Sequence, residues 1–165
     1  MTKLVSTEMD SPVGVLTLVA SSAGLRAILW PKERTGRVVF SEDPTPGSHE
    51  ILEVARTQLR EYLALERTEF DVPFDMVGTD FQIGVWLGLI KIPYGQTRTY
   101  GDLATDLDRP GAARAVGAAT GRNPLSIVVP CHRLVGTNGK LTGFAGGLET
   151  KKWLLEHESA SQRLL

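Results

Sequence analysis

The sequence holds a single cysteine, and its neighbours could support nucleophilic chemistry. Cys131 comes directly before His132 and closely follows the apolar run 126–129. A thiol ordinarily has a pKa of about 8.5 and reacts as the thiolate, so His132 could activate Cys131 by taking its proton directly or through a water molecule. Neighbours along a chain need not point the same way, however, and a lone cysteine is usually a small buried apolar side chain. On these residues alone both interpretations stay open.

The cysteine and histidine counts exclude other kinds of site. One cysteine cannot form an intrachain disulfide, and with only three histidines the usual structural zinc sets cannot be assembled. We therefore expect no metal, and we expect Cys131, if it acts, to act as a thiol.

Charge is distributed unevenly along a chain whose net charge is only −1. Residues 1–78 carry 8 Lys/Arg and 12 Asp/Glu, whereas residues 79–165 carry 10 and 7. Between Arg109 and Lys152 there are seven basic residues and one acid, Glu149. An acidic half beside a basic segment predicts an anionic partner for the second half.

No membrane or export segment is predicted. No apolar run approaches the roughly 18 residues of a membrane helix, and the chain begins Met1-Thr2-Lys3-Leu4 without the apolar core of a signal peptide. We expect a cytoplasmic protein with ordinary globular composition, 42% apolar and 22% charged.

The first half has the pattern of an α/β domain. A strand with one apolar face is predicted from Val13 to Val19, and residues 25–30 form its hairpin partner across the turn 21–24. The Pro- and Gly-rich stretch 31–48 indicates a surface loop, and apolar residues at helical spacing indicate a helix over 51–63.

A further strand and a boundary close this half. Residues Phe70 to Met76 alternate, and Pro73 favours the edge of a sheet because it lacks an N–H. We place the domain boundary at residues 78–80, which predicts an α/β scaffold domain over 1–78 and a mostly helical domain over 79–165.

The second half is predicted to contain three helices before the cysteine. Phe81, Val85 and Leu89 mark the first, in which Gly84 and Gly88 suggest close packing against a neighbour. The pair Thr99 and Asp102 resembles a capping box for the second. After the turn 109–111, the third runs over 112–120 in small residues, and the run 126–129 is predicted to be a buried strand.

The second and third helices form a helix-turn-helix pattern in which the third carries one long cation, Arg114. Any pair of helices joined by a turn looks similar. The small side chains of 112–120 are explained equally by tight helix packing or by close approach to a nucleic-acid groove.

Several separated motifs together resemble one family, the O6-alkylguanine-DNA alkyltransferases, which repair DNA by direct reversal. The motifs are Ile92-Pro93-Tyr94-Gly95-Gln96-Thr97-Arg98-Thr99-Tyr100, Ala112-Ala113-Arg114-Ala115-Val116-Gly117, Asn123-Pro124, Pro130-Cys131-His132-Arg133-Leu134-Val135-Gly136, Thr142-Gly143-Phe144 and Gly146-Gly147. The resemblance covers 79–158 closely and the first half weakly. It implies a ribonuclease-H-like α/β domain followed by a mostly α domain with a winged-helix-like helix-turn-helix.

The resemblance implies a catalytic set and no cofactor. Cys131 would accept the alkyl group irreversibly, once per molecule, with His132 as its base and Glu158 orienting the imidazole. Glu158 shares a helix face with Lys151 and Leu155 at spacings of three and four. Tyr100 would donate a proton to the departing guanine, and Asn123 would act as a hinge residue beside the thiol.

It also implies double-stranded DNA as partner, bound through the minor groove by a chain that is monomeric in solution; cooperative assembly on DNA is left open. The target nucleotide must leave the stack, and Arg114 would fill the vacated space. O6-alkylguanine, and with less support O4-alkylthymine, is the implied substrate. The remaining implied DNA contacts are Ala113, Gly117, Gln82, Gly101, Arg109 and Thr137. The implied pocket residues are Val135, Phe144, Ala145, Gly146 and Lys151.

The chain also departs from the family pattern. Ile83-Gly84 stands where many relatives have polar or basic residues, which predicts a missing phosphate contact and weaker DNA binding. Phe144 and Ala145 replace the tyrosine and serine of some relatives, so one pocket hydroxyl is absent.

Three functions remain as alternatives. The first is a single-turnover alkyltransferase. The second is a non-catalytic damage-binding relative, which Cys131 disfavours because such proteins replace the cysteine. The third is a helix-turn-helix regulator with an inert thiol, which leaves the motif 130–133 and Glu158 unexplained.

Overall fold

The computed structural model describes residues 3–163, with side chains described to residue 160. Met1 and Thr2 lie outside the described residues, and the expectation of no signal peptide partly rests on them. The C-terminal end of the predicted second domain also lies outside the described residues. The chain folds into two compact units, Met1–Val77 and Gly78–Leu165. Within residues 3–163, no helix is both long and apolar enough to cross a membrane.

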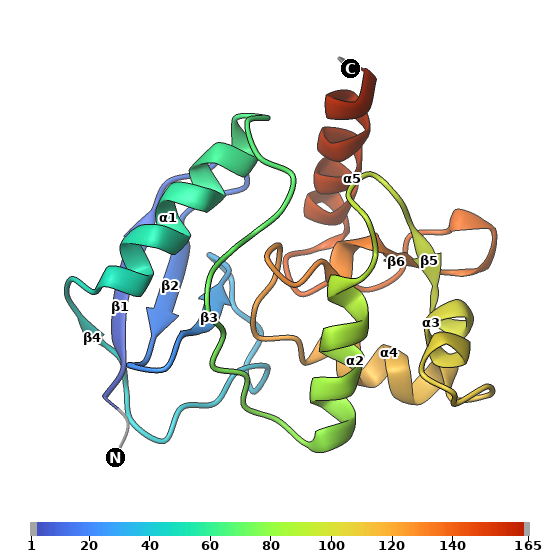
Figure 1. Cartoon of the computed structure of the whole chain (residues 1–165), viewed down its shortest axis with the longest axis horizontal. Helices are drawn as coiled ribbons and strands as arrows, with labels where there is room; N and C mark the ends of the chain where they lie inside the picture. The colour runs from blue at the N-terminus through green and yellow to red at the C-terminus, as the bar shows by residue number, and fades with distance from the viewer. Residues whose placement is uncertain (1–2, 164–165) are drawn as a thin grey trace. The chain divides into compact units, whose positions relative to one another are not determined.

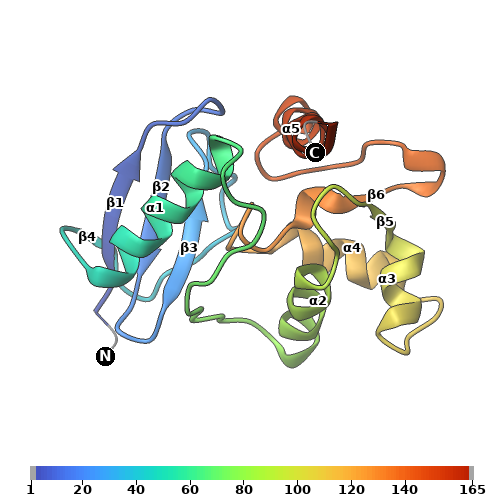
Figure 2. The ribbon, with the colours of Figure 1, turned by 45° about the horizontal axis from the view of Figure 1, so that its top comes forward.

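The first unit is a four-stranded sheet with one helix packed on it (Figure 2). The sheet order is β3-β2-β1-β4, with β4 parallel to β1 and the other neighbours antiparallel. Its elements are β1 (Val5–Met9), β2 (Leu16–Ala20), β3 (Leu25–Leu29), β4 (Thr45–Pro46) and α1 (Glu50–Leu63). Buried leucines of β2 and α1, such as Leu18 and Leu59, form its core. The predicted hairpin and helix are confirmed.

In this unit, one predicted strand begins later than expected and another is wrong. Strand β2 begins at Leu16 because Val13 lies in a turn closed by the Gly14 N–H on the Ser11 carbonyl. The segment 70–76 makes only an isolated bridge, Phe74 to Leu25. The Gln58 side chain instead pairs with both the N–H and the C=O of Asp71, so a side chain on α1 takes hydrogen bonds that a neighbouring strand would have taken.

The second unit packs three helices together (Figure 1), namely α2 (Asp80–Ile90), α3 (Tyr100–Asp106) and α4 (Ala113–Gly121). The capping box of Thr99 and Asp102 is confirmed at the start of α3. Gly111, at a φ of +91° that favours glycine, lies in the turn from α3 to α4. The Trp86 indole N–H donates to the Ala119 carbonyl and joins α2 to α4.

The two glycines of α2 have different surroundings. A Cβ at Gly88 would lie 3.0 Å from a Leu103 methyl carbon, so α3 approaches α2 closely there, as predicted. A Cβ at Gly84 would meet nothing within 4 Å. The prediction of close packing is therefore wrong at Gly84, which lies against open space.

The cysteine segment differs from its prediction. The run 126–129 is a buried turn, not a strand, because Ile127 has a φ of +76°, which no regular strand allows and which is rare for a β-branched residue. The turn leads into a short 3-10 helix, η1 (Cys131–Arg133), and then into β6 (Leu134–Val135).

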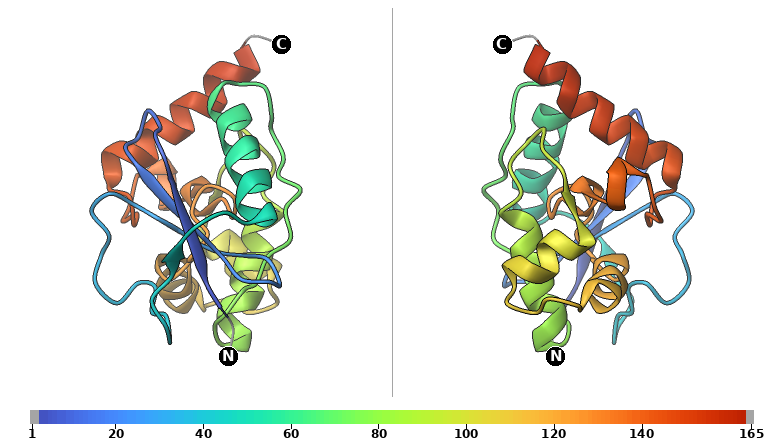
Figure 3. Two further views of the ribbon diagram at one scale, coloured as in Figure 1. Left: turned by 90° about the vertical axis from the view of Figure 1, so that its left-hand side faces the viewer. Right: turned by 90° about the vertical axis from the view of Figure 1, so that its right-hand side faces the viewer.

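Three further elements complete the described part of the second unit. Strand β5 (Arg98–Thr99) pairs in parallel with β6, placing Thr99 opposite Val135. After a second 3-10 turn, η2 (Thr137–Gly139), the described part of the chain ends in the long helix α5 (Leu148–Arg163; Figure 3), and α5 packs on η1.

Candidate active site

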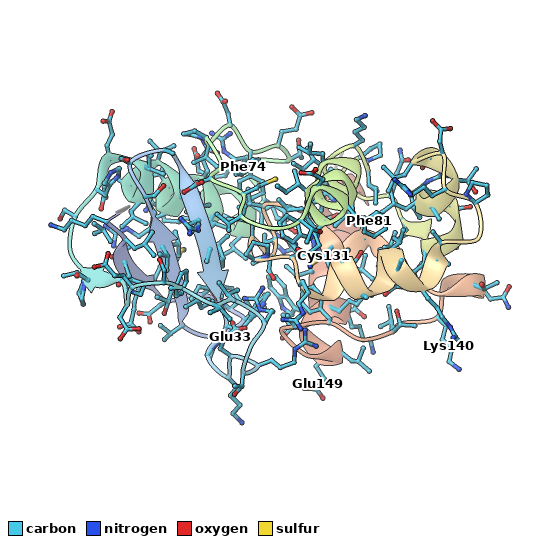
Figure 4. All side chains as sticks on the ribbon, turned by 90° about the horizontal axis from the view of Figure 1, so that it is seen from below. Glu33, Phe74, Phe81, Cys131, Lys140 and Glu149 are labelled. Atoms are coloured by element: carbon cyan, nitrogen blue, oxygen red, sulfur yellow. The ribbon has the colours of Figure 1, made fainter. Side chains whose placement is uncertain are left out.

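Cys131, labelled in Figure 4, is the first residue of η1. It is almost fully buried, with 5% exposure. Its N–H donates to the Val129 carbonyl at 2.8 Å, and the Val129 N–H in turn donates to the Leu125 carbonyl at 2.8 Å. The backbone before the thiol is thus hydrogen-bonded within its own segment and not to a sheet, so the position of Cys131 depends on a stable turn.

Asn123 closes that turn from its other end. Its side-chain N–H donates to the Val129 carbonyl at 2.9 Å, and its side-chain oxygen accepts from the Leu125 N–H at 3.0 Å. Asn123 follows α4 by two residues and is almost completely buried. It therefore couples the end of α4 to the backbone of Cys131. This arrangement is compatible with Asn123 acting both as a turn former and as a hinge residue.

The imidazole of His132 is fully buried, and its Nε2 lies 2.6 Å from a carboxylate oxygen of Glu158. Because a carboxylate accepts, Nε2 carries the hydrogen and Nδ1 keeps its lone pair. Nδ1 has no hydrogen-bond partner among the described residues. Burial lowers the pKa of His132, and the bond to Glu158 opposes this only in part. The ring is therefore a neutral base at physiological pH.

Glu158 is a buried carboxylate saturated with donors. Besides His132, it accepts two bonds from the Arg133 guanidinium, at 2.9 and 3.0 Å, and one from the Gly95 N–H at 3.1 Å. Burial alone would raise the pKa of Glu158, but the hydrogen bonds from His132 and Arg133 and the Arg133 charge hold it well below its usual range. On α5 the buried face carries Lys151, Leu154 and Glu158, while Leu155 is only half-buried.

Arg133 is a site residue that sequence reasoning missed, because it counted there only as a positive charge. Its side chain is 7% exposed, and its third bond runs to the Ile92 carbonyl at 2.7 Å. The guanidinium carbon lies 5.5 Å from the Tyr94 ring centroid. The signal that could have found it is an arginine inside a largely apolar run, where a cation needs a buried anionic partner.

Tyr100 is brought to the site by the pairing of β5 with β6. It is the first residue of α3, directly after Thr99, and its hydroxyl lies 2.6 Å from the Thr142 hydroxyl. The Lys151 ammonium group, also buried, donates to the Leu134 carbonyl at 2.6 Å. Burial lowers the pKa of Lys151, and the nearby Cys131 sulfur opposes this shift electrostatically.

Comparisons with known proteins agree across both units. The family model for the 6-O-methylguanine DNA methyltransferase DNA-binding domain matches residues 80–160, and the model for the ribonuclease-like domain of the same proteins matches residues 4–76. The chain belongs to the 6-O-methylguanine DNA methyltransferase family. The resemblance seen in the sequence motifs is thereby confirmed.

Relatives within this methyltransferase family are similar over nearly their whole length. The methylated-DNA–protein-cysteine methyltransferase of Mycobacterium bovis is 47% identical, over 92% of this chain and 90% of its own. That of Methanosarcina acetivorans is 43% identical, over 92% and 96%. The crystal structure of Mycobacterium tuberculosis OGT in complex with DNA matches at a TM-score of 0.82 and 45% identity, over 96% of this chain and 94% of the other.

For this methyltransferase family member, the expected pocket residues lie on β6 and in the loop between η2 and α5. Val135 is buried in β6, and Phe144, Ala145 and Gly146 are half-buried in the loop between η2 and α5. That loop is anchored by Lys151 and ends in the first turn of α5.

The expected DNA contacts lie on four separate elements. Arg114 is exposed on α4 beside the half-buried Ala113 and Gly117; Gly101 is exposed on α3, and Thr137 on η2. Arg109 is exposed with its guanidinium 5.6 Å from the Phe81 ring centroid. Gln82 has a structural task already, because its side-chain oxygen caps α2 by accepting from the Thr79 N–H.

Proposed function

We propose that this chain is a methylated-DNA–protein-cysteine methyltransferase that repairs O6-alkylguanine by moving the alkyl group onto Cys131. The observation that carries the proposal is the buried hydrogen bond between His132 and Glu158, directly after the buried Cys131 in the chain, in a member of the 6-O-methylguanine DNA methyltransferase family. A regulator with an inert thiol would not need a His132 imidazole whose Nε2 is held by the ionised Glu158 carboxylate.

The reaction follows from the states of these groups. His132 takes the thiol proton at Nδ1, directly or through water, and Glu158 stabilises the imidazolium that forms. The thiolate attacks the alkyl carbon, so the S–C bond forms as the C–O6 bond breaks. Tyr100 gives its proton to N3 of the departing guanine. The thioether that remains cannot return to a thiol by this route, so each molecule reacts once, without a cofactor.

Duplex DNA is the proposed partner, contacted through its minor groove by α3, the following turn and α4 as a winged-helix-like helix-turn-helix. The second unit has the basic charge this requires, and the small residues of α4 permit close approach. Arg114 is exposed on that helix and would occupy the space left by the flipped nucleotide. The DNA backbone around the flipped nucleotide would be contacted by Ala113, Gly117, Gly101, Arg109 and Thr137. The Gln82 amide nitrogen would make a further contact.

The remaining roles are proposals of the same kind. Residues 1–78 would act as a ribonuclease-H-like scaffold, and 79–165 as the DNA-binding and alkyl-acceptor domain of a cytoplasmic monomer. The pocket formed by Val135, Phe144, Ala145, Gly146 and Lys151 would hold the extrahelical guanine. O4-alkylthymine is a second substrate to be tested.

The test is incubation with duplex DNA containing one O6-methylguanine, followed by intact mass measurement and peptide mapping. We expect one added methyl group per protein, on Cys131, and none on the Cys131→Ser or Cys131→Ala variant. Methylation at another residue, or an unchanged mass for the wild-type protein, would overturn the proposal.

A further inference from the structure

Thr142 has close neighbours on three sides. Its backbone carbonyl lies 3.4 Å from the Lys151 ammonium group. Its methyl carbon would lie 3.2 Å from a Cβ at Gly136, so a side chain at residue 136 would require the loop to shift slightly. With the methyl group and backbone fixed in this way, the hydroxyl points to the Tyr100 phenol oxygen, 2.6 Å away.

Tyr100 is positioned by its backbone, and its ring packs near α4. Its backbone begins α3 directly after the Thr99 cap, and its ring carbons would lie 3.6 Å from a Cβ at Gly117 on α4. Both partners of the short hydrogen bond are half-buried, where such a bond is stronger than in water. The contact thus joins a loop residue to the proton donor over 42 positions of sequence.

We propose that Thr142 is a positioning residue for alkyl transfer, whose hydroxyl orients the Tyr100 phenol and donates to its oxygen as the proton leaves. This rests on the proposed function, and specifically on Tyr100 as the proton donor. It assigns a task to a hydroxyl that the reaction as described above does not use.

The chemistry depends on the direction of the hydrogen bond. A hydroxyl can rotate, so in the resting protein either oxygen can donate. When the phenol proton moves to guanine N3, negative charge develops on the phenol oxygen, and only Thr142 can then be the donor. A hydrogen bond to a charged oxygen is roughly twice as strong as a neutral one. Thr142 therefore stabilises the transition state more than the ground state, which is the condition for a faster reaction. Solvent returns the proton to Tyr100 afterwards.

The experiment is a double-mutant cycle on the second-order rate constant for methyl transfer from O6-methylguanine duplex DNA. Thr142→Val keeps the methyl contact and removes the hydroxyl, and we expect it to slow transfer by about 5- to 20-fold. Thr142→Ser restores the hydroxyl, and we expect a rate within about twofold of wild type. In a Tyr100→Phe background, Thr142→Val should have no further effect, because the two residues act as one unit.

A leaving-group comparison separates chemistry from a damaged pocket. Transfer is measured from free O6-benzylguanine and from an analogue with an electron-withdrawing substituent on the purine ring. The analogue needs less help from a proton donor. The ratio of the wild-type rate to the Thr142→Val rate should therefore be smaller with the analogue than with O6-benzylguanine. A purely structural defect would slow both substrates equally. Should Thr142→Val fold poorly, Thr142→Ala and Thr142→Ser are compared in the same way.

The outcomes distinguish the two proposals. A wild-type protein that leaves Cys131 unmodified refutes the proposed function. If Tyr100→Phe slows transfer while Thr142→Val matches wild type, the role of Thr142 is refuted and the proposed function stands. The role is equally refuted if Thr142→Val slows transfer by the same factor with and without the phenol hydroxyl, or if Tyr100→Phe has no effect.

Discussion

Replacing Glu158 by Gln tests the buried polar network most directly. The carboxylate accepts four hydrogen bonds, three of them from His132 and Arg133. A glutamine of the same shape has one accepting oxygen, and its NH2 group can only donate, so at least one donor is left facing another donor. The Arg133 guanidinium also loses the carboxylate that balances its charge, while the arginine side chain stays buried.

The expected magnitude follows from that unpaired cation. Removing one partner of a buried ion pair costs about 3 to 5 kcal/mol in the free energy of unfolding. Domains of ordinary stability have about 5 to 15 kcal/mol in total, so the loss is a large fraction of it. Alkyl transfer should fall by at least about 100-fold, because His132 loses the group that fixes its Nε2 hydrogen and stabilises its charged form.

The assay combines urea unfolding with single-turnover alkyl transfer, and two further variants separate folding from catalysis. Glu156→Gln is the matched control, since Glu156 is exposed on the same helix and lies 3.9 Å from an exposed lysine; we expect a change within about 0.5 kcal/mol. The double variant Arg133→Met/Glu158→Gln removes both buried charges. It should recover more than half of the lost stability and none of the lost activity.

Two results would refute this reasoning. A Glu158→Gln protein as stable as Glu156→Gln would show that the carboxylate is not the centre of a buried ion pair. A double variant that regains wild-type transfer together with its stability would show that Glu158 serves the fold alone.

Three other predictions concern DNA binding and pH. Arg114→Ala should weaken repair of duplex DNA far more than reaction with free O6-benzylguanine, since only the duplex requires nucleotide flipping; equal losses would contradict that role. Gly84→Arg adds a cation where the structure leaves open space, and it should strengthen duplex binding measured by fluorescence anisotropy. The slope of log affinity against log salt concentration, otherwise shallow, should become steeper by about one unit. An unchanged affinity would count against a missing phosphate contact at Ile83-Gly84. The free energy of unfolding should decrease as the pH falls below the ordinary His pKa of 6.5, because His132 has a lowered pKa when folded and takes up its proton only on unfolding. It should decrease again below the ordinary Glu pKa of 4.5, because the pKa of Glu158 is also lowered in the folded protein. Urea unfolding between pH 8 and 4 measures this, and a constant stability of the wild-type protein, or an unaltered profile for His132→Gln between pH 7 and 5, would contradict it.

Local features were predicted well because they depend on residues close together in the sequence. The helix α1 follows from apolar spacing, and the start of α3 from the side chains of Thr99 and Asp102. The motif around Cys131, read together with the motifs of the helical half, was enough to indicate the family. Each of these signals lies within a few turns of one element or in a short run of residues.

Local signals also failed where tertiary contacts took precedence. The apolar run 126–129 has the composition of a strand, but the side chain of Asn123 bonds it into a turn and Ile127 takes a left-handed backbone conformation. Alternation over 70–76 likewise indicated a strand, yet Gln58 satisfies the backbone of Asp71 from a helix. Gly84 and Gly88 are equivalent in sequence, and only the position of α3 distinguishes them.

By itself, then, the sequence indicated a candidate nucleophile with a candidate base beside it, the cap of α3 and the charge of the second half. The family resemblance already paired Glu158 with His132, and only the tertiary structure added Arg133 and Thr142 to these groups. Glu158 meets His132 and Arg133 across about 25 positions, and Tyr100 meets Thr142 across 42. Such pairs have no periodic signature, because they depend on the register of β5 with β6 and on the face that α5 turns toward η1.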